Sequence, residues 1–463
     1  MQTIYNKQAQ KQACSVPFFI KLHVFTAVLY LLVYLFLSQN NAFAGSVTEL
    51  NQPDSIPNNS IENITQIIDR AELAWKNNET ENAESIALKG FEFTQGQQLP
   101  DSVYAELLHV YGKILIDQQL NVQGIDTLLK SIRLKIQAFD EHHKSLSKTY
   151  NYIGIAYFQM REYQKANEYY KMSTGILVKN ELWGTHLFDS YLNIGIVEAV
   201  QGQYDKAFGY FDTTRMVADS IGNQIDSLML ARFYLNYGLL ATLNGKLDDG
   251  NSFLNKSEII FHAKYGPDYL KISDINFNKG LNAYFDYDFK KAELYYKKAL
   301  EVYRQNNNVE DRISRAYVNL ASINLKLDQY DQAIQYSNKG LEYEVPDELR
   351  WLHYSNLAQA YIAKNDEENA LKYFNNAIDL EEDGKVSSIK KINLYIEFAN
   401  FLLKKGQFTE SKKYYTQASE LIANSFGKNA AAYAHILSRL GYYYLATNSI
   451  DSSLRYFNDA ISI

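Results

Sequence analysis

A pair of small residues twelve positions apart recurs along most of this 463-residue chain. One example is Gly154 with Ala166, in the stretch Thr149–Ser173. Apolar side chains occur at helical spacing on both sides of the polar turn Gln159–Arg161, which predicts two helices packed against each other. Glycine costs about 1 kcal/mol relative to alanine inside a helix. Its presence at Gly154 therefore indicates that the two helix backbones approach each other closely.

The same register occurs ten times, at intervals of 37 to 43 residues. The first small position is held by Ala71, Gly112, Gly154, Gly195, Gly238, Gly280, Ala321, Ala358, Ala399 and Gly441. The second is held by Ala83, Gly124, Ala166, Ala207, Gly250, Ala292, Ala333, Ala370, Ser411 and Ser453. A single helix pair cannot bury its apolar face alone, so a stacked array of pairs is predicted.

This pattern resembles the tetratricopeptide repeat (TPR), whose signature includes two small residues and the tyrosine represented here by Tyr157. The resemblance covers Ile61–Ile463 and implies an all-α, right-handed superhelical solenoid of about ten helix-turn-helix repeats. The interval exceeds the usual 34 residues and resembles the longer subtype of kinesin light chains and bacterial sensors. Phe139–Leu146 and Tyr265–Asp268 resemble the connectors of that subtype.

The first 44 residues have the features of a secretory signal peptide. Three lysines precede the apolar run Val24–Leu37, and Ala42-Phe43-Ala44 fits a small-x-small cleavage site. We expect cleavage after Ala44 and a periplasmic or extracellular destination. The run is short for a membrane span, so an uncleaved membrane anchor is the less favoured alternative. Residues 45–60 contain two prolines and many Ser and Asn, which predicts a flexible leader.

Composition argues against several functional classes. The net charge is −7, whereas a general nucleic-acid binder needs a basic face. Cys14 is the only cysteine and precedes the expected cleavage site, so the mature chain would have no disulfide or thiolate metal site. His142 and His143 lie next to acidic residues, but they fit a family-type connector better than metal ligands. Because no catalytic or phosphate-binding motif occurs, we predict no enzyme activity, no cofactor and no metal site.

A row of asparagines lies two residues before the first small position in five successive repeats. The row consists of Asn193, Asn236, Asn278, Asn319 and Asn356. In TPR proteins this position faces the concave groove, and by resemblance such an asparagine ladder binds a peptide main chain. An amide side chain offers both a donor and an acceptor, which matches a peptide unit. The alternative is that each asparagine bonds to a neighbouring helix.

Apolar residues on the same helices form a predicted groove floor. They are Leu192, Ile196, Leu235, Leu239, Phe277, Leu281 and Tyr284. An apolar floor suits an extended or helical peptide. The alternative for each residue is core packing between repeats.

Together these features predict an exported, non-catalytic protein that binds a protein segment or peptide in its concave groove. The alternative is a stand-alone or truncated periplasmic sensor, since its organisation resembles the sensor half of bacterial signalling receptors. The last repeat, Gly441–Ile463, would leave apolar Leu454 and Phe457 on an uncapped helix. That face predicts a homodimer contact or a membrane-protein partner.

Overall fold

The computed structural model describes residues 60–77, 79–307, 309–382 and 388–463. The predicted signal peptide, residues 1–44, and almost all of the predicted leader lie outside these residues, so both stay predictions. Every regular element in the described part of the chain is a helix. None of these helices is both long enough and apolar enough to cross a membrane.

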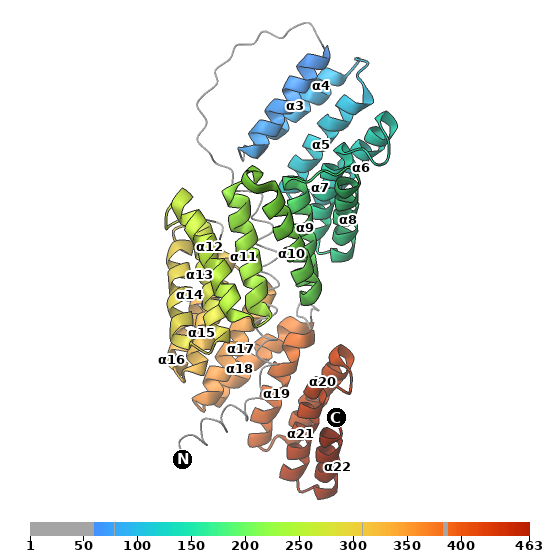
Figure 1. Ribbon diagram of the computed structural model, residues 1–463. Coiled ribbons are helices and arrows are strands. Elements are labelled where there is room, and N and C mark those ends of the chain that lie inside the picture. Colours follow the sequence, from blue (N-terminus) through green and yellow to red (C-terminus); the bar gives the residue numbers. More distant parts are fainter. Residues whose placement is uncertain (1–59, 78, 308, 383–387) are drawn as a thin grey trace. The chain divides into compact units, whose positions relative to one another are not determined.

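The helices form ten consecutive pairs, one for each predicted repeat (Figure 1). The pairs are α3 (Ser60–Lys76) and α4 (Thr80–Thr94), α5 (Asp101–Asp117) and α6 (Asn121–Ala138), α7 (Ser145–Gln159) and α8 (Tyr163–Lys179), α9 (Thr185–Val200) and α10 (Tyr204–Ile221), α11 (Ser227–Leu243) and α12 (Leu247–Tyr265), α13 (Leu270–Phe285) and α14 (Phe289–Tyr303), α15 (Glu310–Lys326) and α16 (Tyr330–Leu341), α17 (Asp347–Ala363) and α18 (Glu367–Glu382), α19 (Ser388–Lys404) and α20 (Phe408–Phe426), and α21 (Ala431–Ala446) and α22 (Ile450–Ile461). This confirms the all-α repeat architecture.

The chain divides into two compact units at the boundary between Leu240 and Ala241, inside α11. The N-terminal unit, as described, comprises residues 60–240, and the C-terminal unit comprises residues 241–463 with its gaps. Sequence analysis predicted one uninterrupted solenoid and did not anticipate this division. The right-handed sense of the superhelix stays a prediction.

The small residues are where the two helices of a pair meet. A Cβ atom at Gly154 would lie 2.5 Å from Cε1 of Tyr170, which is fully buried on α8. At Gly195 the nearest atom would be Cδ2 of Phe211, at 2.7 Å. Such distances are well below van der Waals contact, so a glycine here allows a large ring from the second helix to pack against the first helix. The close approach inferred from the sequence is confirmed.

The turn between the two helices of a pair has one repeated geometry. Its residue seven positions after the first small residue is left-handed in each of the nine pairs in which that residue is described, for example at Arg161, with φ 63°, and at Gly202, with φ 76°. The next amide donates back across the turn, as Glu162 N does to the Tyr157 carbonyl at 2.9 Å. This bond closes the end of the first helix in the manner of a Schellman motif. The predicted turn at Gln159–Arg161 is thereby confirmed.

Candidate functional site

In the N-terminal unit, the ladder asparagines bond to their own protein. Asn193 on α9 is 6% exposed, and its Nδ2 donates to Oδ1 of Asn151 on α7 at 3.2 Å. Asn236 on α11 is 1% exposed and donates to the carbonyl of Arg232, one turn earlier, at 2.9 Å. Asn193 therefore matches the alternative in which the amide joins neighbouring helices.

The ladder asparagines of the C-terminal unit fall into three different environments. Asn356 on α17 donates to the Val318 carbonyl on α15 at 3.1 Å, and so again links two helices. Asn278 on α13 is fully buried, and neither of its polar side-chain atoms has a hydrogen-bond partner among the described residues. Asn319 on α15 is partly exposed. A role for any of the five in ligand binding stays a prediction.

The predicted groove floor is part of the packed core. Leu192, Ile196, Leu235, Leu239, Phe277 and Leu281 are each 3% exposed or less. Tyr284 is half-buried and lies edge-on to Phe289, and burial raises the pKa of its hydroxyl to about 12. These side chains match the packing alternative, because α9, α11 and α13 bury them against neighbouring helices. Ligand contact by these residues stays a prediction.

The two histidines of the α6–α7 connector have structural roles. His143 stacks on Phe139 with 4.0 Å between ring centroids, and its Nδ1 lies 2.8 Å from Oγ of Ser145 at the start of α7. The His142 amide donates to Asp140. Within the described residues, no group of three or more His, Cys, Asp or Glu side chains is placed to hold a metal.

Sequence analysis did not identify a hollow of the N-terminal unit, which we call the connector pocket. Its volume is about 600 Å³. It is lined by Glu106, Lys144, Ser145, Ser147, Lys148, Leu177, Leu182, Trp183, Gly184, Thr185, His186 and Gln224. These residues come from four segments: α5, the start of α7, the stretch from the end of α8 through the α8–α9 connector to the start of α9, and the short 3-10 helix η1 (Gly222–Gln224).

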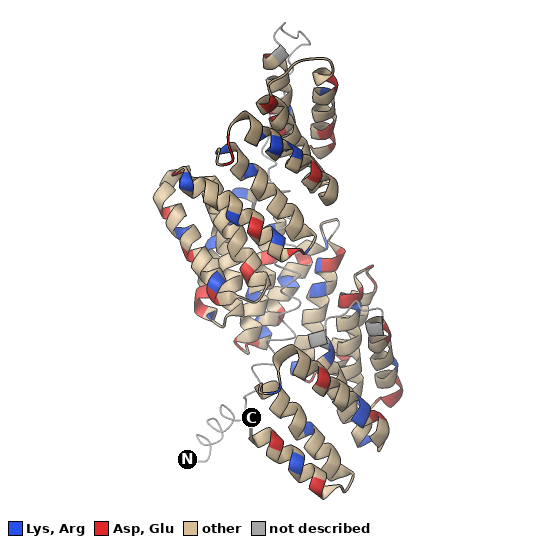
Figure 2. Ribbon diagram, turned by 90° about the vertical axis from the view of Figure 1, so that its right-hand side faces the viewer, with Lys and Arg blue, Asp and Glu red and all other residues tan. Residues whose placement is uncertain are grey.

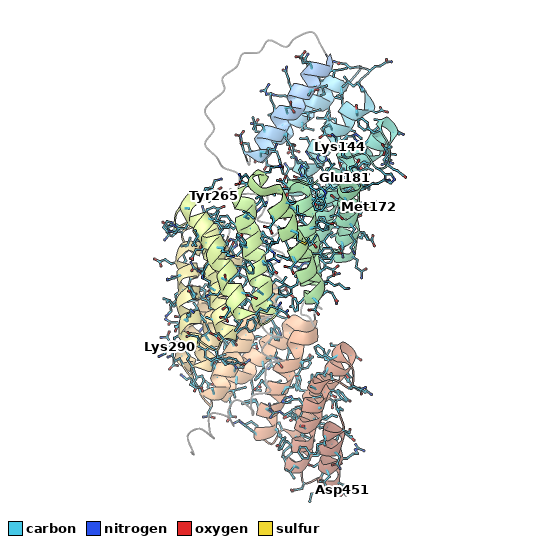
Figure 3. The ribbon with its side chains drawn as sticks, viewed as in Figure 1. Lys144, Met172, Glu181, Tyr265, Lys290 and Asp451 are labelled. Carbon is cyan, nitrogen blue, oxygen red and sulfur yellow. The ribbon has the colours of Figure 1, made fainter. Side chains whose placement is uncertain are left out.

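Two connectors frame this pocket and are held together by a hydrogen bond. Asn180 Nδ2, at the end of α8, donates to the His142 carbonyl of the α6–α7 connector at 3.0 Å. Figure 3 labels Lys144 and Glu181, which belong to these two connectors. The pocket therefore lies where two successive repeats begin, and its walls come from segments about forty residues apart in sequence.

A polar network around the buried Lys135 links α5, α6 and α7 next to the pocket. Lys135 on α6 is 2% exposed and forms an ion pair with Glu106, with 3.0 Å between Nζ and Oε2. The same Nζ donates to Oγ1 of Thr149 at 3.1 Å, and Thr149 in turn bonds to the buried His109. Burial lowers the pKa of Lys135, and Glu106 opposes that shift. Glu106 is the one acidic residue among those that line the pocket, and its charge is paired with that of Lys135.

His186, which lines the pocket, is affected by nearby lysines. The pKa of His186 is lowered to about 4, mainly by burial and then by the positive charges of Lys148, Lys113 and Lys76, in that order. At neutral pH His186 is therefore uncharged, so the positive charge of the lining resides on Lys144 and Lys148. Elsewhere, basic and acidic residues are scattered over the helices (Figure 2).

The segments around the pocket also expose apolar side chains. Trp183 is 59% exposed and Leu182 is 36% exposed, both in the α8–α9 connector. Phe139 in the preceding connector and Val178 near the end of α8 are also about half exposed. Exposed large apolar side chains grouped around a hollow are typical of an interaction surface.

A second apolar surface lies on the last helix pair, in the C-terminal unit. Ile450, Leu454 and Ile461 of α22 are all more than half exposed, as are Tyr442 and Leu445 of α21. Phe457 packs edge-on against Tyr442. The apolar face that the sequence placed on this helix is therefore present, although which partner covers it is not tested.

Two family models described as tetratricopeptide repeat match the chain. One matches residues 391–463, and the other matches residues 314–344 and 354–383. These matches cover five of the helices from α15 to α22 completely and others in part.

Two curated proteins are similar over part of their length. The RxLR effector protein SFI4 of Phytophthora infestans is 23% identical over 177 residues, which are 37% of this chain and 51% of that protein. Response regulator aspartate phosphatase I of Bacillus subtilis is 28% identical over 149 residues, 32% of this chain and 35% of that protein. The matches thus span only about half and a third of these relatives.

Two solved structures are similar to this chain. The apo form of the quorum sensor NprR from B. thuringiensis has a TM-score of 0.49 at 15% identity, with 87% of this chain and 97% of that chain covered. A tetratricopeptide repeat protein from Parabacteroides merdae has a TM-score of 0.43 at 13% identity, with 66% and 98% covered. At such low identity the likeness concerns the fold alone. Helix pairs of the same register continue the matched repeats through the rest of the described residues. This chain is therefore a tetratricopeptide-repeat protein.

Proposed function

We propose that this is an exported, non-catalytic protein that binds a segment of a partner protein or a peptide. TPR folds are generally protein-interaction scaffolds rather than catalysts. Repeat solenoids of this kind offer extended surfaces for such contacts. The fold alone does not assign a partner, so the proposal rests on a particular site.

The observation that carries the proposal is the connector pocket with its exposed apolar border. Its volume of about 600 Å³ lies within the range of about 300–1,000 Å³ that is common for ligand sites. Trp183 offers a large, rigid surface at low cost in side-chain entropy, as aromatic residues do at binding surfaces. Lysines and hydroxyl groups beside it supply the polar contacts that fix orientation.

The asparagine ladder is a second location for the same function. It is less favoured because Asn193 and Asn356 already bond to neighbouring helices. A ligand would have to replace those bonds, and breaking a buried hydrogen bond costs about 1–3 kcal/mol for each group left unpaired.

A pull-down from periplasmic and membrane extracts separates the two locations. The bait is the mature chain, residues 45–463. We expect Trp183→Ala combined with Leu182→Ala to lose the partner, because these side chains border the pocket and are exposed. The ladder variant Asn236→Ala with Asn278→Ala should keep it. Circular dichroism checks that each bait remains folded.

The opposite result, with the partner lost only from the ladder variant, would place binding in the predicted groove. A partner that survives both variants but is lost when Leu454 and Ile461 are changed to aspartate would place binding on α22. That outcome favours the second candidate function, a sensor module that works through a separate membrane protein or a second copy. A neighbouring reading frame for a membrane-spanning kinase would support it.

Export is proposed from the sequence of residues 1–44, and it predicts a defined product. When the chain is expressed in a Gram-negative host, we expect the periplasmic protein to begin at Gly45. Ala44→Arg should block cleavage, because the peptidase needs a small residue there. N-terminal sequencing and intact mass measure both products. Recovery of the chain from the cytosol with residues 1–44 attached would refute export.

A further inference from the structure

Two lysines of the connector pocket lie on one face of α7. Lys144 is the residue immediately before the helix, and Lys148 follows it by four positions. Residues four apart on a helix are neighbours, and like charges at this spacing repel each other. Both side chains are exposed, and neither forms an ion pair with another described residue.

Their position is unfavourable for the helix itself. The N-terminus of a helix carries partial positive charge, so lysine at this end lowers helix stability. The first turn of α7 contains no acidic residue that would compensate. Sequences depart from such local preferences for charge at helix ends mainly at functional sites. An anion held between the two lysines would remove both the mutual repulsion and the conflict with the helix end.

The same pocket provides an apolar contact next to this charge. Leu177 forms buried lining, and Leu182 and Trp183 are exposed at the border. A free inorganic anion would use only the lysines. A peptide with an acidic residue next to an apolar one would use both surfaces at once.

We propose that the connector pocket binds an acidic peptide segment, with a carboxylate between Lys144 and Lys148 and an adjacent apolar side chain against Trp183 and Leu182. This rests on the proposed function that the protein binds a protein segment. Charge complementarity selects the occupant, because Glu106 is already paired with Lys135 and the remaining charged lining is basic.

Nucleic acid is a different class of anion and is disfavoured by the rest of the chain. The protein carries a net charge of −7. Figure 2 shows acidic residues along the helices of both units. Binding to a nucleic-acid backbone requires many basic contacts along a track, whereas two lysines match a single carboxylate.

The test uses the mature protein, residues 45–463, and an array of short peptides. Every peptide has a central pair of glutamates between randomised apolar flanks, and a matched array has glutamines in their place. We expect the glutamate array to bind, and the best peptide to lose about tenfold or more in affinity on change to glutamine, because hydrogen bonds to charged groups are the stronger ones.

Variants of the lysines provide the matched controls. Lys144→Gln with Lys148→Gln should weaken the best peptide by about tenfold or more, and the corresponding double change to arginine should retain binding. Lys171→Gln with Lys206→Gln removes the same charge from exposed positions on α8 and α10 and should leave the affinity unchanged. Binding should also weaken with added salt.

The fluorescence of Trp183 reports whether the peptide binds in the connector pocket. It is exposed, whereas Trp351 is fully buried and Trp75 is partly buried, so a peptide in the pocket should shift the fluorescence mainly through Trp183. Trp183→Phe should abolish that shift. Absence of binding to the glutamate array, equal binding of the glutamine array, unchanged affinity of the lysine-to-glutamine variant, or preference for a single-stranded oligonucleotide would each overturn the acidic-peptide proposal. If the pull-down still recovers a partner, the proposed function survives that failure.

Discussion

Replacing Gly340 with alanine lowers the stability of the C-terminal unit by about 3 kcal/mol, although alanine is the better helix former. A Cβ atom at this position of α16 would lie 2.0 Å from Cε1 and 2.2 Å from Nε2 of His353 on α17. These distances are far below van der Waals contact. The expected loss exceeds the gain of about 1 kcal/mol in helix propensity.

The His353 ring cannot move aside without further cost. It is fully buried, and its Nε2 lies 2.9 Å from Oγ of Ser314 on α15, which in turn donates to the Gly340 carbonyl at 3.1 Å. Burial lowers the pKa of His353 to about 3, so the ring is neutral at ordinary pH. Rotating it would break the bond to Ser314 and leave buried polar atoms unpaired.

Thermal and urea unfolding, followed by circular dichroism, measure this effect. The control is Gly209→Ala on α10, where an added Cβ would have no atom within 4 Å outside its own helix. That change should stabilise the helix by about 0.5–1 kcal/mol. The two variants should therefore shift the transition in opposite directions. Equal stabilisation by both would show that the His353 contact does not limit this position.

The second large effect is expected at a buried ion pair of the C-terminal unit. Arg312→Leu should destabilise the protein by about 3–5 kcal/mol, because it removes the guanidinium that donates to the buried Asp274 carboxylate and leaves Lys271 as a more distant counter-charge. Asp274 on α13 is fully buried, and its Oδ1 accepts from Arg312 NH1 at 3.1 Å and from the Tyr303 hydroxyl at 2.9 Å. Lys271 is 3.6 Å away from the other carboxylate oxygen.

A double-mutant cycle isolates this pair. Asp274→Leu together with Arg312→Leu should cost clearly less than the sum of the single changes, since both buried charges are then removed. The control is Arg215→Ala, which breaks an exposed pair with Asp212 at 3.2 Å and should change stability by no more than about 1 kcal/mol. Additive single effects in the Asp274 cycle would contradict the argument.

The repeat register was predictable because its causes are local. The small residues, the polar turn and the packing ring of a pair lie within about twenty positions, as Gly154, Arg161 and Tyr170 illustrate. The fold repeats the same contacts in each pair, so a fixed spacing in the sequence indicates them directly. Gly340 lies seven residues after the second small position, where every repeat has a small residue, but the atom it meets belongs to His353 of the next repeat.

The candidate site was less predictable because it depends on how repeats stack. The sequence placed asparagines and apolar residues on the correct helices but could not distinguish a groove lining from a core. Asn356 is an example. The direction of its amide is set by the hydrogen bond to the Val318 carbonyl, which belongs to another repeat. The connector pocket has walls from four separate segments, and none of them carries a recognised motif.

The amino-acid sequence by itself determined that the chain forms ten helix pairs and where each pair turns, because helix periodicity, small residues and turn geometry act within one repeat. Only the tertiary structure decided which polar groups satisfy one another, which glycines tolerate no side chain, and that Lys144, Lys148 and Trp183 border one hollow. Those outcomes depend on contacts between repeats, whose distances no local pattern specifies.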